Sequence, residues 1–366
     1  MKAIAIVPGT KKAFITERPE PTISAPDEVK IKILQVGICG TDREEVAGGR
    51  ADPPPGSKEL VIGHENFGRV TEVGSAVTGV KPGDHAMFTV RRDCEPCICG
   101  SHNDMCFKGE YTERGIKGRD GYQVEYAVDK ARYLIRIPEE IKHIGVLAEP
   151  MSVSEKAINE SVRIQCARLP EAKQDTWLQG KKVLVAGLGP IGLLAAFILR
   201  LRGADVYGLD IVDEDTLRPT LLTQIGGNYV DGRKVKTENL DDQLGQIDMI
   251  FEATGVASLE FELIDALGIN GIYVLTGIPA GERPLSIIGA PLLQQVVLKN
   301  QIFLGSVNAG IDDFSRGIEE LTEAHRKYPD QIAKVITSRV PVDHFEDVFS
   351  HHDVNEIKSV IEWEKP

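Results

Sequence analysis

The feature that most constrains how this chain can fold is a glycine pattern near its middle, Gly187-x-Gly189-x-x-Gly192. The pattern follows an apolar stretch typical of a β-strand, Lys182–Ala186, and opens a helical run that continues to Arg202. Glycines at this spacing permit a tight turn and let a pyrophosphate approach the backbone, while the helix N-terminus provides N–H groups for the phosphates. Pro190 fits the first turn of that helix, where an N–H has no helical partner. The pattern predicts a dinucleotide-binding turn; the alternative is a glycine-rich turn without a ligand.

Segments typical of strands and helices alternate after this turn. The predicted strands are Val206–Leu209, Met249–Ala253, Gly271–Leu275 and Ile302–Val307, and the predicted helices lie around Glu214–Gln224 and Leu259–Leu267. Alternation of this kind indicates a parallel sheet with helices on both faces. The predicted fold class is therefore α/β, with a doubly wound parallel-sheet domain that binds the dinucleotide.

An acidic residue ends the strand that follows the glycine pattern. Asp210 lies 18 positions after Gly192, where a carboxylate would accept hydrogen bonds from the adenosine ribose and repel a 2′-phosphate. No arginine follows at once, because the next residues are Ile211-Val212-Asp213-Glu214. We therefore expect NAD to be preferred over NADP; the alternative is an exposed aspartate at a strand end.

The first 155 residues have a different character. Short β-type runs, such as Val29–Val36 and Gly68–Val73, are separated by turn residues such as Pro53-Pro54-Pro55-Gly56. This pattern predicts an irregular antiparallel barrel. From about residue 309 the pattern is mixed again, with a helix expected at Ile318–His325 and a closing strand at Ile357–Trp363.

Charge and length exclude several classes of partner. The chain of 366 residues is long enough for two domains, and its formal charge of −13 argues against nucleic acid or an anionic membrane surface as a partner.

The start of the chain reads as a strand without a signal-peptide cleavage site, and its longest apolar run, near Ile191 to Leu199, is too short to span a bilayer. We expect a cytoplasmic protein.

A second cluster of chemistry-bearing residues lies near the N-terminus. Cys39, His64 and a carboxylate, either Glu65 or Glu149, offer the three protein ligands of a catalytic zinc with one position left for water or substrate. Thr41 follows Cys39 closely enough to relay a proton from a metal-bound alcohol. Taken alone, Cys39 between glycines is more often a small buried residue, so this prediction depends on the rest of the chain.

Four cysteines form a compact lobe further on. Cys94-x-x-Cys97-x-Cys99 is followed by Cys106, and four thiolates on one loop suit a closed, tetrahedral structural zinc site. Free buried cysteines, the alternative, would rarely cluster so tightly. We expect Cys166, which stands alone in a helical stretch, only to pack.

These motifs resemble those of a known family. Gly63-His64-Glu65-x-x-Gly68-x-Val70-x-x-Val73-Gly74 resembles the zinc signature of the medium-chain alcohol dehydrogenases, and the cysteine lobe and the glycine turn follow in that family's order. Further segments, spread over the whole length, are similar to the archaeal-type glucose 1-dehydrogenases: Gly37–Glu44, Arg91-Arg92, Glu113 to Gly121, Leu147–Pro150, Gly305–Asn308 and Glu356–Lys358.

The resemblance implies a GroES-like barrel over residues 1–155, a Rossmann domain over 156–308 and a C-terminal segment, 309–366, that returns to the barrel. It implies a zinc-dependent oxidation of an aldose at the anomeric carbon to the lactone, with NAD(P) as acceptor, and a homo-oligomer, dimer or tetramer. By position it matches Cys39, His64, Glu65 and Glu149 to the catalytic metal set, and Thr41, Glu113, Glu149 and Asn308 to the sugar contacts. The expected cofactor contacts are Gly187, Gly189, Pro190, Ile191, Gly192, Asp210, Thr254, Gly277, Val307 and Asn308.

The chain also departs from the family's pattern. The cysteine lobe is two residues shorter than usual, and Asp210-Ile211-Val212 replaces the Asn-Arg-Arg that typically holds a 2′-phosphate. Within the same class, a polyol, L-threonine or other secondary-alcohol dehydrogenase would carry identical zinc and cofactor motifs. A non-catalytic relative is a further alternative, which the intact set of Cys39, His64 and Glu149 disfavours.

Overall fold

The computed structural model describes residues 1–94, 104–281, 284–350 and 353–366 and consists of two compact units. Unit 1 comprises residues 1–152, 308–325 and 332–366, and unit 2 comprises residues 153–307 and 326–331. The long helix α2 (Ala148–Arg168) begins in unit 1 and ends in unit 2. The domain boundaries at residues 155 and 308 stay predictions.

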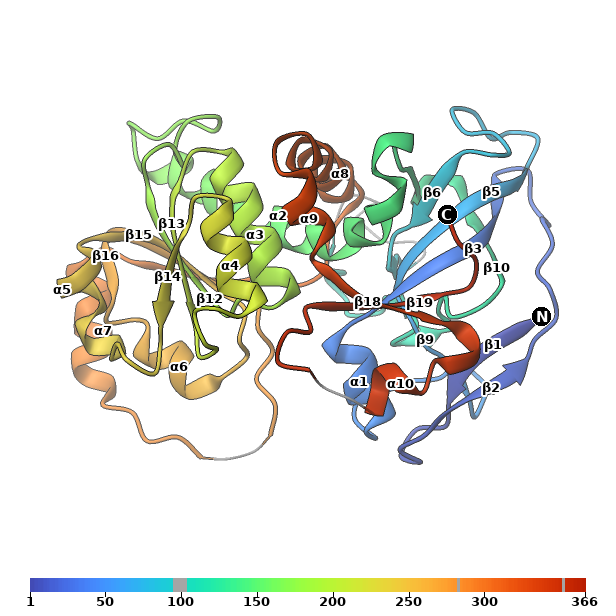
Figure 1. The fold of residues 1–366 in the computed structure, drawn as a ribbon, viewed down its shortest axis with the longest axis horizontal. Coiled ribbons are helices and arrows are strands. Elements are labelled where there is room, and N and C mark those ends of the chain that lie inside the picture. The colour runs from blue at the N-terminus through green and yellow to red at the C-terminus, as the bar shows by residue number, and fades with distance from the viewer. Residues whose placement is uncertain (95–103, 282–283, 351–352) are drawn as a thin grey trace. The chain divides into compact units, whose positions relative to one another are not determined.

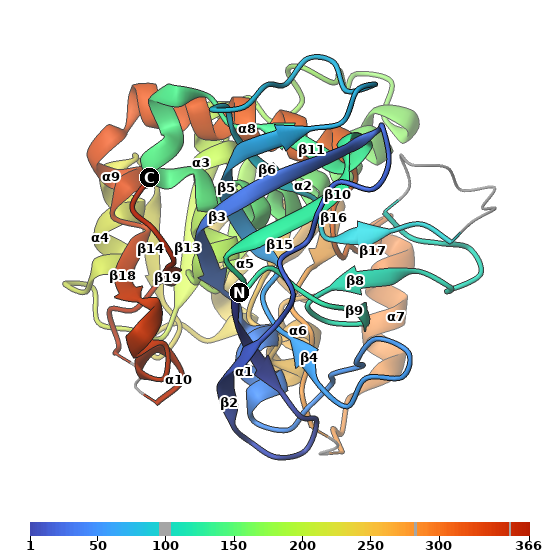
Figure 2. The ribbon, with the colours of Figure 1, turned by 90° about the vertical axis from the view of Figure 1, so that its right-hand side faces the viewer.

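Unit 1 is built around a seven-stranded sheet whose longest strand is β3 (Glu28–Ile38). This strand pairs antiparallel with β5 (Glu65–Val73), β10 (Tyr126–Lys130) and β19 (Lys358–Glu362). Its apolar residues are buried almost throughout, and neighbouring strands pair with both of its edges. The last strand of the chain thus lies beside one of the first. Figure 2 shows β10 beside β3, where it pairs with the residues from Glu28 to Lys32.

The remaining strands of unit 1 are β1 (Lys2–Ile6), β2 (Ala13–Glu17), β4 (Leu60–Val61), β6 (His85–Phe88), β7 (Arg91–Arg92), β8 (Thr112–Arg114), β9 (Gly118–Arg119), β11 (Leu134–Arg136) and β18 (Ile336–Pro341). Strands β2, β1 and β4 form one small sheet, and β7, β8 and β9 form another. The helices wholly or partly in this unit are α1 (Gly40–Val46), η1 (Ala131–Tyr133), η2 (Glu139–Leu147), α8 (Ile311–Lys327), α9 (Pro329–Ala333), η4 (Val342–His344) and α10 (Asp347–Ser350).

Unit 2 contains a six-stranded parallel sheet in the order β14-β13-β12-β15-β16-β17, which is the strand order of a doubly wound dinucleotide-binding fold. Its strands are β12 (Lys182–Ala186), β13 (Asp205–Asp210), β14 (Asn228–Asp231), β15 (Ile247–Glu252), β16 (Leu267–Leu275) and β17 (Ile302–Gly305). Its helices are α3 (Pro190–Leu201), α4 (Leu217–Gln224), η3 (Thr237–Asn239), α5 (Leu240–Leu244), α6 (Ala257–Glu262) and α7 (Gly289–Leu298). Figure 1 shows α3 and α4 beside the strands β12 to β14. The predicted α/β class with a parallel sheet is confirmed.

Several elements differ from the sequence prediction: β14 and α7 were not predicted, and the helix expected at Ile318–His325 begins at Ile311. The helix expected near Leu259–Leu267 ends at Glu262, because Leu267 already begins β16. The chain also forms a 21-residue helix, α2, of which the sequence indicated only the start and a later stretch. Its buried positions include Ser154, Glu155 and Asn159, so that it lacks the apolar stripe by which an amphipathic helix is recognised. Among the described residues, no helix is long and apolar enough to cross a bilayer.

Candidate active site

Three residues of unit 1 converge at the ends of β3 and β5. Cys39 is the N-cap of α1, directly after β3, while His64 precedes β5 and Glu65 is its first residue. The Cys39 Sγ, an imidazole nitrogen of His64 and a carboxylate oxygen of Glu65 all lie within 4.8 Å of one another. Gly37 makes room for this group, because a Cβ at its position would come within 2.0 Å of the Glu65 carboxylate.

Asp42 is the buried residue that holds two of these side chains in place. Its carboxylate accepts the N–H of Cys39 at 2.8 Å and that of Gly63 at 3.2 Å. Its Oδ1 lies 3.6 Å from Nδ1 of His64. Burial alone would lower the pKa of His64, but the Asp42 carboxylate outweighs it and holds that pKa well above its usual value. A carboxylate behind a ligating histidine orients the ring and strengthens it as a ligand; no pattern in the sequence indicated this role for Asp42.

Glu65 has a buried cationic partner that no sequence pattern indicated either. Lys358 Nζ, at the start of β19, lies 2.6 and 2.8 Å from the two Glu65 carboxylate oxygens and 3.1 Å from the Ile38 carbonyl. Both side chains are almost completely buried, at 2% and 1% exposure. The pairing of β19 with β3 brings together two residues that lie 293 positions apart.

Glu149 and Thr41 do not belong to the three residues that converge, Cys39, His64 and Glu65. Glu149 is buried in the first turn of α2, and burial, reinforced by the charge of Glu65, raises its pKa to about 7. It is not among the three residues whose ligand atoms converge within 4.8 Å. Thr41 is half-buried on α1, with its hydroxyl 3.9 Å from the Cys39 sulfur.

The donor set fits a zinc ion. A thiol, an imidazole and a carboxylate are the ligand types of catalytic zinc sites, and three protein ligands leave one position open. The convergence of one atom of each type within 4.8 Å supports the same ion. The predicted roles of Cys39, Thr41, His64, Glu65 and Glu149 nevertheless stay predictions.

A buried acid beside this group, Glu45 of α1, gives a prediction on pH. Neither of its carboxyl oxygens has a hydrogen-bond partner, and burial, reinforced by Asp42, raises its pKa to about 9. A carboxyl group with a raised folded-state pKa favours the folded protein at low pH and loses that contribution as pH rises. The parent is expected to lose this contribution as pH rises, whereas Glu45→Gln has no such group to lose. The free energy of unfolding of Glu45→Gln should therefore rise relative to that of the parent from pH 5 to 9, by on the order of a few kcal/mol.

Thermal unfolding midpoints of zinc-loaded parent and Glu45→Gln protein across that pH range would test this. Glu319→Gln, which changes an exposed acid on α8, serves as the control and is expected to follow the parent at every pH. A constant difference between Glu45→Gln and the parent from pH 5 to 9 would contradict the raised pKa.

Two of the predicted sugar contacts, Glu113 and Asn308, are joined by a polar chain. Arg91 donates to the Glu113 carboxylate from Nε at 3.1 Å and from Nη2 at 2.7 Å. Its Nη1 donates to the Asp104 carbonyl, which also accepts a hydrogen bond from Asn308 Nδ2 at 3.4 Å. Asn308 itself has a left-handed backbone, with φ of 58°. Glu113 is thus an ion-paired acid rather than a solvated one, although its role as a sugar contact stays a prediction.

The cysteine lobe lies only partly within the described residues. The Sγ atoms of Cys94 and Cys106 are 3.1 Å apart, while the predicted ligands Cys97 and Cys99 lie outside the described residues. A hydrogen bond from Cys94, followed by the backbone N–H groups of residues 108–110, lowers the pKa of the Cys106 thiol. The same hydrogen bond raises the pKa of the Cys94 thiol. Within this pair it is therefore Cys106 whose thiolate, the form that binds zinc, is favoured.

The glycine turn of unit 2 has the geometry of a phosphate-binding turn. Gly187 has a positive φ of 87°, and a Cβ at Gly192 would come within 1.8 Å of the Gly187 carbonyl oxygen. A Cβ at Gly189 would meet nothing within 4 Å, so that position faces open space at the start of α3, which begins with Pro190 and Ile191. Both observations fit the entry of a pyrophosphate at the helix N-terminus.

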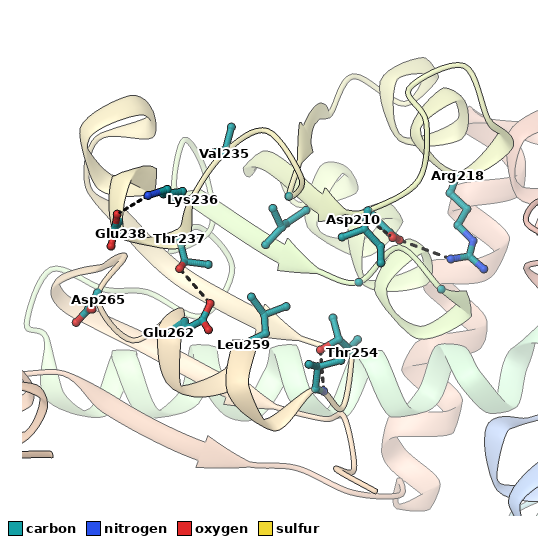
Figure 3. A pocket seen from close by; sticks show the side chains of 17 residues that line it. Asp210, Arg218, Val235, Lys236, Thr237, Glu238, Thr254, Leu259, Glu262 and Asp265 are labelled. Atoms are coloured by element: carbon teal, nitrogen blue, oxygen red, sulfur yellow. Dashed lines mark hydrogen bonds and ion pairs between the residues drawn. The ribbon is translucent and has the colours of Figure 1, made fainter. Parts of the chain in front are cut away.

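A cavity of about 820 Å³ adjoins this turn, and Figure 3 shows its lining. Gly187, Gly189, Asp210 and Thr254 line it. Asp210 Oδ2 accepts the N–H of Leu188 at 2.9 Å, which ties the end of β13 to the glycine turn. Arg218 lines the same cavity and lies 3.6 Å from Asp210.

Glu252 directly precedes Ala253 and Thr254 of the cavity lining and was not identified from the sequence. Its fully buried carboxylate accepts N–H groups from Thr254 at 2.5 Å, Gly255 at 3.1 Å and Gly277 at 3.3 Å. The predicted cofactor contacts Thr254 and Gly277 are thereby held on neighbouring loops. Thr254 lines the cavity together with Gly187, Gly189 and Asp210, whereas Gly277 is not among its lining residues. Val307, 41% exposed, is not among its lining residues either.

Comparison with known proteins gives matches over the whole chain. The family model "Glucose dehydrogenase C-terminus" matches residues 142–363, and "Alcohol dehydrogenase GroES-like domain" matches residues 25–139. A glucose 1-dehydrogenase of Thermoproteus tenax is 36% identical over 365 residues, covering 98% of this chain and 99% of its own length. A glucose 1-dehydrogenase of Methanocella arvoryzae is 35% identical and covers 99% of both chains.

A solved structure agrees with these sequence matches. The glucose dehydrogenase of Haloferax mediterranei, in complex with NADP, zinc and gluconolactone, superposes with a TM-score of 0.87. It is 30% identical in sequence and covers all of both chains.

Proposed function

Since this chain belongs to the glucose dehydrogenase family of zinc-containing medium-chain alcohol dehydrogenases, we propose that it oxidises glucose at the anomeric carbon to the lactone, with zinc and NAD(P). The observation that carries the proposal is the convergence of Cys39, His64 and Glu65 within 4.8 Å, at the ends of paired strands. We assign residues 1–155 and 309–366 to the catalytic domain and residues 156–308 to the dinucleotide-binding domain. The four-cysteine lobe would hold a second, structural zinc.

In the proposed mechanism, zinc and the nicotinamide supply the reactive chemistry, while the protein side chains bind, orient and carry protons. Zinc, when bound, supplies a Lewis acid that makes the anomeric hydroxyl more acidic, and the nicotinamide accepts the hydride. Cys39, His64 and Glu65 or Glu149 would hold the metal, and Asp42 would orient the His64 ring. Thr41 would carry the hydroxyl proton outward, since its own hydroxyl is half-buried beside Cys39.

Orientation of the sugar is the proposed role of Glu113 and Asn308. Arg91 fixes the Glu113 carboxylate through two N–H groups, and the Asp104 carbonyl links Arg91 to Asn308. A carboxylate held this way presents its remaining lone pairs in a defined direction. Sites that pair a substrate's hydroxyls discriminate strongly against analogues that lack one.

The reaction is tested by following reduced cofactor by its absorbance with glucose, galactose, xylose, sorbitol and threonine, each with NAD and with NADP. Activity with glucose, lost with a chelator and restored by zinc, is the expected result. Reduction with sorbitol or threonine but with no aldose would instead favour the polyol or secondary-alcohol alternative. Metal analysis is expected to give about two zinc ions per chain.

We propose a preference for NAD, based on Asp210 at the end of β13. Asp210→Ala is expected to lower kcat/KM for NAD about tenfold, because the variant loses hydrogen bonds to the ribose, and to improve the use of NADP by removing a negative charge. Asp205→Ala, at the opposite end of the same strand, is the matched control and should leave both cofactors unaffected. An unchanged kcat/KM for NAD in Asp210→Ala would exclude the ribose contact.

A homo-oligomer is proposed from the exposed apolar surface of unit 2. Strand β17 is the last in the order of its sheet and exposes Phe303, and α7 exposes Leu293, Val297 and Leu298 at 64%, 76% and 74%. An apolar helix face beside an edge strand is typical of a surface that another copy covers. Light scattering of the purified protein would give its mass in solution, and a monomer at all concentrations would exclude this proposal.

A further inference from the structure

A second cavity, of about 400 Å³, lies in unit 1 and shares no lining residue with the group of Cys39, His64 and Glu65. Five cationic side chains line it: Arg92, Arg114, Arg119, Lys130 and Arg132. They come from β7, β8, β9 and β10 and from the turn η1 that follows β10. A concentration of positive charge is unexpected in a chain whose formal net charge is −13, and it creates a local field that attracts anions.

The acidic residues of this cavity are already engaged. The Asp129 carboxylate accepts hydrogen bonds from Arg92 Nε at 3.0 Å and from Arg114 Nη2 at 2.5 Å, so that one carboxylate forms ion pairs with two guanidinium groups. Glu28 accepts two backbone N–H groups and a hydroxyl, from Ser24 and Ala25, at 2.7 to 3.1 Å. Asp93, the third acid, has a partner of its own. The cationic groups thus exceed the carboxylates by five to three.

Arg119 is the cation whose charge is not balanced. It is half-buried, and its hydrogen bond is from Nε to Thr112 Oγ1 at 3.3 Å. Within the described ranges no carboxylate lies within 4.0 Å of its guanidinium nitrogens. Burial lowers the pKa of Arg119, the neighbouring positive charge of Arg114 lowers it further, and the Asp129 carboxylate offsets this only in part. A partly desolvated guanidinium with no carboxylate in direct contact is costly, and an anion in the cavity would relieve that cost.

We propose that this cavity binds a phosphate-class oxyanion, either inorganic phosphate or the phosphoryl group of a small metabolite, with Arg119 as its principal ligand. The two Nη groups of a guanidinium match the spacing of two phosphate oxygens, which favours a tetrahedral oxyanion over a halide. Arg132, stacked on the Tyr133 ring at 4.8 Å, and Lys130 supply further charge at the same cavity. This site is independent of the proposed sugar oxidation.

Calorimetric titration of the zinc-loaded protein tests the proposal, with NADH present at saturation so that the phosphate-binding turn at Gly187–Gly192 is occupied. Inorganic phosphate and glycerol 3-phosphate are the probes, at an ionic strength held constant with chloride. Saturable binding of phosphate or of both probes is expected. Arg119→Gln is expected to weaken that binding at least about tenfold. Arg136→Gln, which changes an exposed arginine of β11 paired with Asp84, is the matched control and should bind as the parent does.

Two results would overturn the proposal. One is the absence of saturable binding of either probe up to about 10 mM. The other is undiminished binding by Arg119→Gln, which would mean that the anion binds elsewhere. If Arg119→Gln fails to fold, Arg132→Gln serves as the second variant, and parent-like affinity in it would also contradict the proposed site. Tighter binding of phosphate than of glycerol 3-phosphate would identify inorganic phosphate as the ligand, and the reverse order would identify the phosphoryl group of a small metabolite.

Discussion

His64→Ala is expected to lower kcat/KM for glucose by on the order of a thousandfold, equivalent to about 4 kcal/mol of transition-state stabilisation. The physical reason is the loss of one of three converging donors, since the Cys39 thiol and the Glu65 carboxylate lie within 4.8 Å of the His64 ring. Two remaining protein ligands bind zinc much more weakly than three. The zinc content should therefore fall by about one ion per chain, and steady-state kinetics together with metal analysis would measure both effects.

His344→Ala provides the control for this variant, because His344 is exposed in η4 and contributes to no metal group among the described residues. It should keep the parent's kinetics and zinc content. Circular dichroism and the unfolding midpoint establish whether His64→Ala remains folded. A folded His64→Ala protein that keeps its zinc and more than a tenth of its activity would refute the proposed metal site.

A variant of Asp42 tests its role in orienting His64 separately from the role of His64 as a zinc ligand. Asp42 lies 3.6 Å from Nδ1 of His64 and accepts the N–H of Cys39. Removing such a supporting carboxylate typically costs about 10- to 100-fold in metal affinity or activity, which is less than loss of a ligand. Asp42→Asn should therefore lie between the parent and His64→Ala in zinc affinity.

Local patterns were sufficient to predict the fold class. The glycine turn between β12 and α3 could be predicted because its features lie next to one another in the chain. These are the apolar strand, the spaced glycines and Pro190 at the start of the helix. The strands of unit 2 are apolar runs bounded by turn residues, and they were recognised for the same reason. Strand β14 was not predicted, because its four residues, Asn228–Asp231, contain a single buried aliphatic side chain, Val230.

The supporting residues of the site could not be predicted in this way. Glu65 and Lys358 meet only because β19 pairs with β3, and no local pattern relates two positions that lie 293 residues apart. Glu252 is similar, since its role depends on loops that follow two different strands. Asp42 was visible beside Cys39, yet its complete burial and its distance from His64 are properties of the folded chain.

The buried pair of Glu65 and Lys358 leads to the second large expected effect. In the zinc-free protein, Lys358→Met would leave a carboxylate at 1% exposure without its cation, and breaking a buried pair in this way costs about 3–5 kcal/mol. The carbonyl of Ile38 would lose a donor as well. We therefore expect unit 1 to unfold at a markedly lower urea concentration, while unit 2, which does not contain either residue, keeps its stability.

Fluorescence can follow unit 1 alone. The chain has two tryptophans, and Trp363 lies directly after β19, with its Nε1 donating to Gln123 at 2.9 Å. Trp177 belongs to unit 2, so a Trp177→Phe background leaves Trp363 as the sole indole reporter. Lys58→Met, at an exposed position of the same unit, is the control and should change the free energy of unfolding by less than about 0.5 kcal/mol.

The double variant Lys358→Met/Glu65→Gln distinguishes an unpaired charge from lost packing. If the cost of Lys358→Met comes from the isolated Glu65 carboxylate, neutralising that carboxylate should restore most of the lost stability, as replacing both members of a buried pair often does. Zinc affinity should be lower in the double variant than in Lys358→Met, because the amide introduced by Glu65→Gln is a poorer zinc ligand than the carboxylate that it replaces. A double variant as unstable as Lys358→Met would instead assign the loss to the buried lysine side chain itself, including its hydrogen bond to the Ile38 carbonyl.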